Sequence, residues 1–166
     1  KDDPKAVAYL CNQFIEEFRT TVFRQTMFAA FEKESHLMAE RGEALTHQAL
    51  TDVYRKLNEK YYGGACEMDD FIGYEWLRIP HFYRAFYVYQ YATGFSAAVA
   101  IADRILTLGD EAVRDYKKFL SAGGSVPPIE ALKYAGVDMN DPATVSGALQ
   151  VFADTVDRLE KALAEE

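Results

Sequence analysis

Residues 73–95 read GYEWLRIPHFYRAFYVYQYATGF, and they hold Trp76, which is the only tryptophan of the chain, together with His81 and a dense run of aromatic rings. Pro80 fixes its own φ angle and disfavours helical backbone in the residue before it, so we expect a helix to begin around His81. Aromatic residues spaced three and four apart then share two neighbouring faces of that helix. One face carries Phe82, Phe86 and Tyr89, and the other carries Tyr83, Tyr87 and Tyr91.

Two interpretations of this aromatic helix are open from the residues alone. Aromatic stripes at helical spacing usually pack in a protein core. Leucine, isoleucine or valine would supply that bulk more simply, whereas a buried tyrosine hydroxyl must find water or a hydrogen-bond partner. Several hydroxyls and the His81 imidazole on adjacent turns therefore favour the wall of a hydrated cleft about as strongly as a core.

The rest of the chain predicts more helices. Apolar residues recur at helical spacing over residues 4–41, which indicates one very long helix that starts behind Asp3 and ends at Gly42. Residues 65–80 lack a long period and are expected to form a connector with one helical turn. The other predicted helices cover about 47–61 behind Thr46, His81 to about Leu108, 110–121, 129–135, and Pro142 to the C-terminal end behind Asp141. No run shows sustained β alternation, so the predicted fold class is all-α.

Composition narrows the classes of function. The chain has 166 residues, 49% of them hydrophobic and 27% charged, and we expect residues 1–166 to form a single helical unit. The net charge of −8 argues against a nucleic-acid partner and disfavours binding to an anionic membrane. No apolar run is long enough to cross a bilayer, and the charged N-terminal residues are unlike a signal peptide. Cys11 and Cys66 lack metal-ligand spacing, which favours free thiols in a reducing cytoplasm and leaves one disulfide open.

Several catalytic motifs are absent from this sequence. It contains no H-E-x-x-H, no Glu-x-x-His pair, no G-x-S-x-G and no glycine-rich phosphate loop. Glu32, His36 and Glu40 fall on one helical face and could hold a metal, but a solvated charged face is the favoured interpretation. What remains is His81 with the tyrosines, because a phenol and an imidazole are good donors to a developing oxyanion. Such a cluster is half of an active site, and its metal or base must come from elsewhere.

The aromatic stretch also resembles a known family. RIPHFYRAFYVYQYATGFSAA at 78–98 resembles the C-terminal signature of oligoendopeptidase F, in the thimet-oligopeptidase-like clan of zinc peptidases. FRTTVFRQTMFAAFE (18–32), ALTHQALTDVYRKLNEKYYG (44–63) and FLSAGGSVPPIEALKYAGVDM (119–139) resemble the same family in the same order. The resemblance implies the multi-helix C-terminal part of a zincin-like oligopeptidase catalytic domain, with one very long N-terminal helix.

The resemblance implies roles for individual residues. Members of the family admit oligopeptides to a deep channel, hold zinc with an H-E-x-x-H motif and a further Glu, and activate a zinc-bound water. A His and tyrosines from the C-terminal part donate hydrogen bonds to the substrate and to the tetrahedral intermediate. Here the resemblance implies His81 as that histidine and Tyr89 as the oxyanion-stabilising tyrosine, with Tyr83 and Tyr87 as substrate-binding residues.

The family's H-E-x-x-H motif is absent from this sequence, so the resemblance does not imply a complete active site. We expect the zinc ligands to lie in an N-terminal half of the same enzyme, so the chain alone should bind no catalytic zinc and cleave nothing. Its expected partners are that half and an oligopeptide, and its expected location is the cytoplasm. The alternative hypothesis is a non-enzymatic helical interaction domain, such as a homodimer, that uses the aromatic helix 81–95 as a partner groove.

Overall fold

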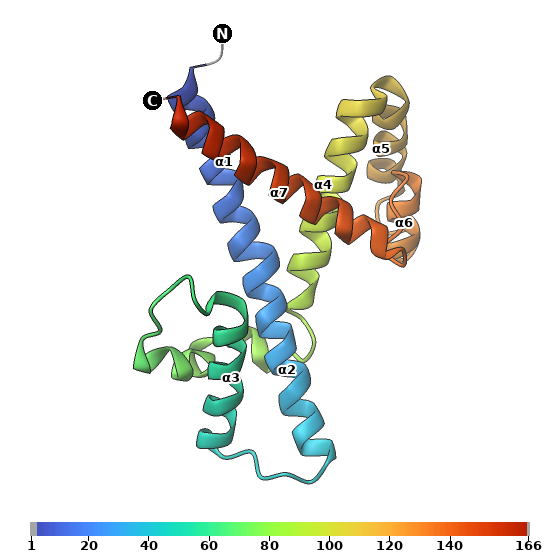
Figure 1. The fold of residues 1–166 in the computed structure, drawn as a ribbon. Coiled ribbons are helices and arrows are strands. Elements are labelled where there is room, and N and C mark those ends of the chain that lie inside the picture. Colours follow the sequence, from blue (N-terminus) through green and yellow to red (C-terminus); the bar gives the residue numbers. More distant parts are fainter. Residues whose placement is uncertain (1–2, 166) are drawn as a thin grey trace. The chain divides into compact units, whose positions relative to one another are not determined.

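The computed structural model describes residues 3–165, and within that range it contains helices and no strand, which confirms the all-α prediction (Figure 1). The elements in chain order are α1 (Pro4–Phe18), the π-helical turn η1 (Arg19–Phe23), α2 (Arg24–Glu40), α3 (His47–Tyr62), the 3-10 helices η2 (Asp70–Arg78) and η3 (Pro80–Tyr83), α4 (Tyr89–Leu108), α5 (Asp110–Ala122), α6 (Pro128–Tyr134) and α7 (Pro142–Ala164). They divide into two compact units. The first comprises the residues up to Arg19 together with those from Thr93 onward, and the second is Thr20–Ala92.

Short polar side chains start three helices where the sequence predicts. The Asp3 carboxylate accepts a hydrogen bond from the backbone N–H of Lys5 at the start of α1. Thr46 and Asp141 do the same for α3 and α7. Each cap satisfies one backbone donor that the first helical turn leaves without a partner. These helix starts are therefore confirmed.

The predicted long helix is interrupted. The chain is helical from Pro4 to Glu40, but the turn Arg19–Phe23 is π-helical rather than α-helical. A π-turn takes up an extra residue and so shifts which side chains share a face before and after it. The helix ends near the predicted position, and Gly42 follows it with φ +75°.

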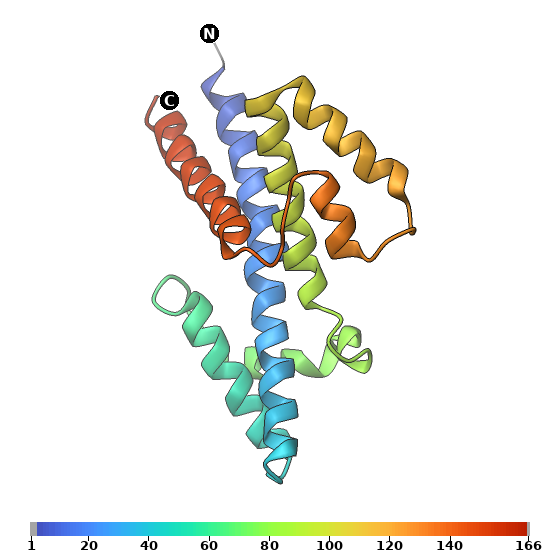
Figure 2. The same ribbon diagram turned by 90° about the vertical axis from the view of Figure 1, so that its right-hand side faces the viewer.

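In the first unit α1 packs along α7, and α5 packs against α6 (Figure 2). Phe18 of α1 is fully buried, and its ring lies 5.6 Å from that of Phe95 on α4 and 4.8 Å from that of Phe152 on α7. A second apolar cluster joins Ala97 and Ile101 of α4 to residues that follow α6. Small residues on α4 allow these close approaches.

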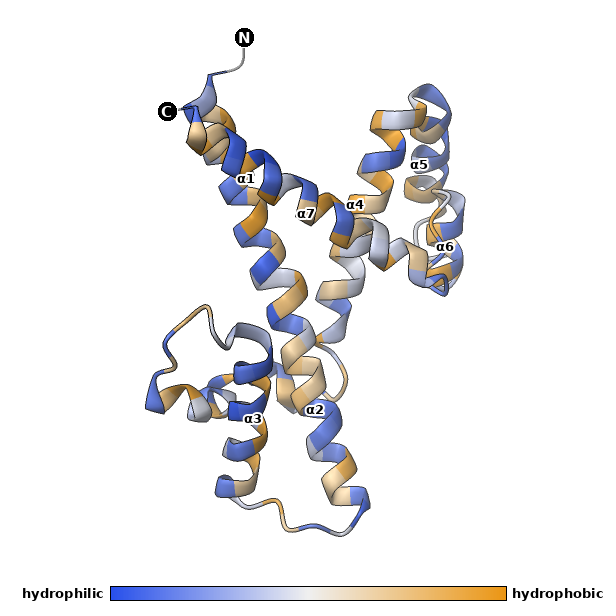
Figure 3. Ribbon diagram, in the orientation of Figure 1, coloured by the Kyte–Doolittle hydropathy of each residue, from blue (hydrophilic) through white to orange (hydrophobic). Residues whose placement is uncertain are grey.

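The second unit packs α2 against α3, and apolar residues alternate with polar ones around both helices (Figure 3). Its core holds Phe28 and Phe31 of α2, Tyr54 of α3 and Val88, all at most 4% exposed. The Tyr54 ring lies 6.3 Å from that of Phe28 and 5.3 Å, edge to face, from that of Phe31. Val88 brings the segment before α4 into this core.

A buried carboxylate connects η2 to both helices of this unit. Glu75 is 7% exposed, accepts a hydrogen bond of 2.7 Å from the Tyr54 hydroxyl, and pairs with Arg24 and Arg78. Burial by itself raises the pKa of Glu75, but the Tyr54 hydrogen bond and the two arginines outweigh it and hold the pKa below the usual 4.5. The predicted connector 65–80 therefore contains a nine-residue 3-10 helix that is tied to the core.

The predicted helix start at His81 is wrong. Pro80 begins only the short helix η3, and α4 begins at Tyr89. Between them Phe86 has φ +56°, in the left-handed region that an α-helix cannot contain. The two aromatic faces expected on one helix, Phe82 with Phe86 and Tyr89, and Tyr83 with Tyr87 and Tyr91, therefore do not form.

The favoured interpretation of Glu32 is also wrong. Instead of lying on a solvated charged face, Glu32 is 4% exposed. Its carboxylate accepts a hydrogen bond of 2.6 Å from the backbone N–H of Phe86, 54 residues away in the chain. The contact satisfies a backbone donor that the broken helix leaves free.

Candidate functional site

The segment Arg84–Val88 positions the aromatic rings that the sequence singles out. Val88 anchors one end of it in the core, and the Glu32 carboxylate holds the Phe86 N–H. The Phe86 ring packs on the imidazole of His36, with centroids 4.6 Å apart. A phenylalanine with positive φ is strained, and such strain persists only where surrounding contacts determine the backbone. These contacts give Tyr87 and the start of α4 a defined position relative to η3.

His81, Tyr87 and Tyr91 form one group, which we term the His81 cluster. The Tyr91 hydroxyl lies 3.1 Å from Nε2 of His81, within hydrogen-bonding distance. The Tyr87 ring stacks parallel to the imidazole with centroids 5.8 Å apart, and the Tyr91 ring stands perpendicular to both at 5.6 Å. Three elements thus contribute to the cluster: η3, the Arg84–Val88 segment and the first turn of α4.

The cluster presents hydrogen-bonding groups at an accessible surface. A hydrogen bond with the Tyr87 side chain raises the pKa of Tyr91, so the Tyr91 hydroxyl keeps its proton at neutral pH. The Arg84 guanidinium lies 4.8 Å from the centroid of the Tyr87 ring and adds positive charge beside it. Tyr91 is 37% exposed, and His81 and Tyr87 are half-buried. Such groups can donate to a polar atom of a bound molecule.

The other two predicted site residues, Tyr83 and Tyr89, have exposed side chains. Tyr83 is 92% exposed and lines a separate pocket of the same unit. Tyr89, the predicted oxyanion donor, is half exposed and follows the buried Val88. The structure therefore brings His81 and Tyr87 together and adds Tyr91, which the sequence analysis did not select. The signal in the sequence was the four-residue spacing of Tyr87 and Tyr91.

The described residues do not fit a metal site. The Glu32 carboxylate accepts a hydrogen bond from the Phe86 N–H, and His36 packs on the Phe86 ring. Both side chains are therefore already in contact with the segment before α4. Over residues 3–165, no three His, Cys, Asp or Glu side chains are placed to hold a metal ion. Cys11 is a buried free thiol and Cys66 an exposed one.

Within the same range, no helix combines the length and the apolar character that crossing a bilayer requires.

An all-α chain with imidazole and phenol donors on an accessible surface has the features expected of the helical peptidases that the sequence resembles. Residues 2–151 match the family described as Peptidase family M3, and the chain belongs to that family.

Named relatives agree with this assignment. The chain is 51% identical over 162 residues to oligopeptidase PepF of Bacillus subtilis (strain 168), an alignment that covers 98% of this chain and 24% of the relative. It is 44% identical over 165 residues to group B oligopeptidase PepB of Streptococcus agalactiae, with 99% and 27% covered. The chain thus spans about a quarter of the length of these curated relatives.

A solved structure confirms the fold. The crystal structure of oligoendopeptidase-F from Enterococcus faecium matches with a TM-score of 0.96 and 47% identity. The match covers 100% of this chain and 32% of the solved one. The resemblance to oligoendopeptidase F is therefore confirmed.

Proposed function

We propose that this chain is the substrate-binding and transition-state-stabilising part of a zinc-dependent oligoendopeptidase that hydrolyses short peptides. Membership of Peptidase family M3 supports the reaction class, and the names of the relatives support oligopeptides as substrates. The observation that carries the proposal is the hydrogen-bonded pair of His81 and Tyr91 at an accessible surface.

The proposed role of the His81 cluster follows from the charge that develops in peptide hydrolysis. Attack on the scissile carbonyl moves negative charge onto its oxygen, and fixed donors near that oxygen stabilise the transition state. The hydroxyl groups of Tyr91 and Tyr87 are O–H donors of the kind that can stabilise that oxygen. Tyr89 stays a second candidate for the oxyanion donor, and Tyr83 stays a candidate for substrate binding.

The zinc expected of such an enzyme would be held by polypeptide outside this chain, because the residues described here do not fit a zinc site. When bound, zinc would supply the Lewis acid for peptide hydrolysis. The chain by itself would then cleave nothing, and its partners would be an oligopeptide and the remainder of the enzyme. We place such an enzyme in the cytoplasm, in line with the free thiols of Cys11 and Cys66.

The test compares two proteins. One is the 166-residue chain, and the other is a polypeptide extended to the length of the relatives, so that it carries an H-E-x-x-H motif. We expect the extended protein to cleave a quenched fluorescent oligopeptide and to lose this activity with a chelator, and the chain alone to do neither. Stoichiometric zinc binding or peptide cleavage by the chain alone would show that the assignment of the missing ligands is wrong.

The alternative hypothesis is a non-enzymatic helical interaction domain. It required one continuous aromatic helix over residues 81–95 as the face of a partner groove. The structure has a 3-10 turn, a non-helical segment and only then α4 over that range. The continuous helical face is therefore missing.

A further inference from the structure

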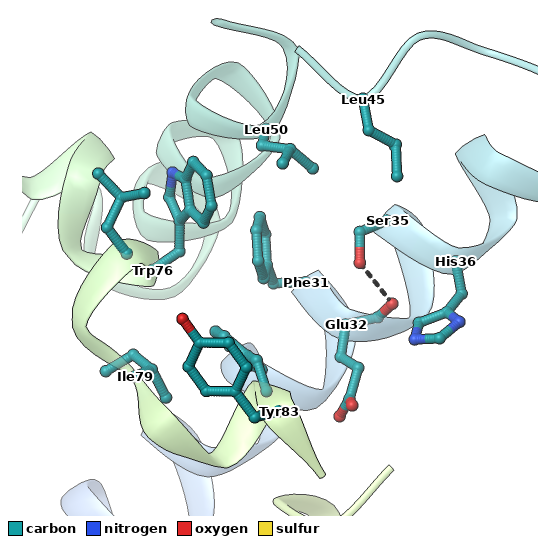
Figure 4. Close-up of a pocket in the computed structure, with 11 residues that line it drawn as sticks. Phe31, Glu32, Ser35, His36, Leu45, Leu50, Trp76, Ile79 and Tyr83 are labelled. Atoms are coloured by element: carbon teal, nitrogen blue, oxygen red, sulfur yellow. Dashed lines mark hydrogen bonds between the residues drawn. The ribbon is translucent and has the colours of Figure 1, made fainter. Parts of the chain in front are cut away.

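The second unit contains a pocket of about 270 Å³ between α2, α3 and the two 3-10 helices. The rings of Phe31, Trp76, Phe82 and Tyr83 line it together with leucine and isoleucine side chains. Figure 4 shows Trp76 and Ile79 on one side and Glu32 and His36 on the other, with the Phe31 ring between them. The pocket is smaller than most drug-sized ligand sites and is suited to a single long side chain.

Glu32 is the one carboxylate that lines this pocket, and its charge lacks a cationic partner. It is 4% exposed and accepts a hydrogen bond from the Phe86 N–H, but no lysine or arginine among residues 3–165 forms an ion pair with it. The other buried glutamate of this unit, Glu75, is paired with Arg24 and Arg78. Because a buried carboxylate is costly without a positive partner, Glu32 favours a cation in the pocket.

The pocket lining complements such a cation. No lysine or arginine lines it, and aromatic rings attract a positive group while their faces pack against an aliphatic stem. An arginine or lysine side chain combines a long apolar stem with a terminal positive charge. The α-ammonium of a peptide has the charge but no stem, so it fits the aromatic walls less well.

We propose that this pocket is a subsite for an arginine or lysine side chain of the oligopeptide. The proposal rests on the proposed peptidase function. His81 and Tyr83 both belong to η3 (Pro80–Tyr83), and Tyr83 lines the pocket. A peptide held at the His81 cluster would therefore have the pocket within reach of a neighbouring side chain.

Trp76 makes the proposal testable in the 166-residue chain, because it is the only tryptophan and lines the pocket. The probes are n-butylguanidinium and its neutral analogue of similar shape, n-butylurea. We expect n-butylguanidinium to change the Trp76 fluorescence saturably and to bind at least about tenfold more tightly than n-butylurea. Equal binding of the two probes, or no saturable change, would overturn the proposal.

Glu32→Gln tests the carboxylate without removing the acceptor, because the amide oxygen can still accept the hydrogen bond from Phe86. We expect this variant to reduce the preference for the cationic probe to about twofold or less. Glu40→Gln is the matched control, since it removes one charge from an exposed position of the same helix and should keep the preference. If Glu32→Gln keeps the full preference as well, the proposal is wrong.

A second variant covers the case in which Glu32→Gln does not fold. Tyr83 is 92% exposed, so Tyr83→Ala should leave the fold unchanged. We expect it to weaken n-butylguanidinium binding about two- to fivefold through loss of one aromatic wall. Unchanged affinity would contradict the proposed position of the cation.

Kinetic measurements on the extended enzyme distinguish a wrong subsite assignment from a wrong proposed function. We expect its kcat/KM to favour arginine over citrulline at one peptide position, and Glu32→Gln to bring that ratio close to one. An enzyme that hydrolyses both peptides equally would overturn the subsite and leave the peptidase function intact, even if the chain alone binds n-butylguanidinium. An enzyme that hydrolyses no peptide would overturn the proposed function itself.

Discussion

The imidazole Nε2 of His81 lies 3.1 Å from the hydroxyl of Tyr91, ten residues further along the chain. The two residues belong to different elements, because η3 carries His81 and the first turn of α4 carries Tyr91. Val88, which lies between these elements in the chain, is fully buried and belongs to the core of the second unit. The candidate site therefore depends on a non-helical segment that a continuous helix would have removed.

Tyr91→Phe in the extended enzyme is expected to lower kcat by about 10²–10³ while KM changes little, because an oxyanion donor acts mainly in the transition state. The measurement is steady-state hydrolysis of a quenched fluorescent peptide. Tyr89→Phe is the matched comparison, since it removes the same atom two residues earlier. A large loss in Tyr89→Phe with normal turnover in Tyr91→Phe would assign the role to Tyr89.

Tyr87→Phe should lower the pKa of Tyr91 toward the usual 10.0, because the hydrogen bond that raises it is lost. The pKa can be followed by NMR of ring-labelled tyrosine, with Tyr91→Phe to identify the resonance. Tyr83→Phe serves as the control and should leave the Tyr91 titration unchanged. An unaltered pKa in Tyr87→Phe would show that the two hydroxyls do not interact in solution.

The Glu75 carboxylate should make the stability of the second unit dependent on pH. Its pKa in the folded chain lies below the usual 4.5, so the unfolded chain binds a proton first as the pH falls. The stabilisation is complete above about pH 5 and is lost as the pH drops through the folded pKa. Urea unfolding of the chain and of Glu75→Gln between about pH 6 and pH 3 should show the smaller pH dependence in the variant. If the chain and the Glu75→Gln variant lost stability in parallel as the pH falls, the proposed role of Glu75 would be contradicted.

Val88→Ala should destabilise the second unit by about 2 kcal/mol, because it leaves a cavity where the side chain is fully buried. Val145→Ala on α7 makes the same change at a position that is 36% exposed, and we expect it to stay within about 0.5 kcal/mol of the parent. Urea unfolding measures both. A negligible effect of Val88→Ala would mean that the segment before α4 is not anchored in the core.

Gly136→Ala should destabilise the first unit by about 1–3 kcal/mol. Gly136 has φ +74°, and a Cβ there would overlap the guanidinium of Arg104, which donates to the Ala135 carbonyl. Gly147→Ala within α7 is the control, since nothing lies within 4 Å of the added atom and alanine favours a helix. We expect that variant to be more stable by about 0.5–1 kcal/mol. Equal changes in thermal stability for Gly136→Ala and Gly147→Ala would contradict this prediction.

Helix boundaries set by local chemistry were predictable. Asp3, Thr46 and Asp141 cap their helices with side chains that reach only two or three residues along the chain. Periodicity likewise indicated the all-α class, since one-sided apolar patterns reflect which face of each helix is buried. The π-turn at Arg19–Phe23 interrupts this pattern by one residue and was missed.

The aromatic segment was mispredicted because its backbone depends on distant residues. The spacing of the aromatic residues agrees with a helix over His81–Val88. In the structure, however, the Phe86 N–H donates a hydrogen bond to the Glu32 carboxylate, and Val88 is buried. These contacts compensate for the positive φ of Phe86. The pairing of Tyr91 with His81 also depends on the folded segment between η3 and α4, which the four-residue spacing of Tyr87 and Tyr91 alone does not specify.

The amino-acid sequence by itself determined the helical class, the capped starts of three helices and the family, because each of these depends on residues close together in the chain or on ordered motifs. Only the tertiary structure decided that Glu32 is buried and that His81 pairs with Tyr91. The physical reason is that these partners are far apart in the chain: the Glu32 carboxylate and the Phe86 N–H are 54 residues apart, so only folding brings them within hydrogen-bonding distance.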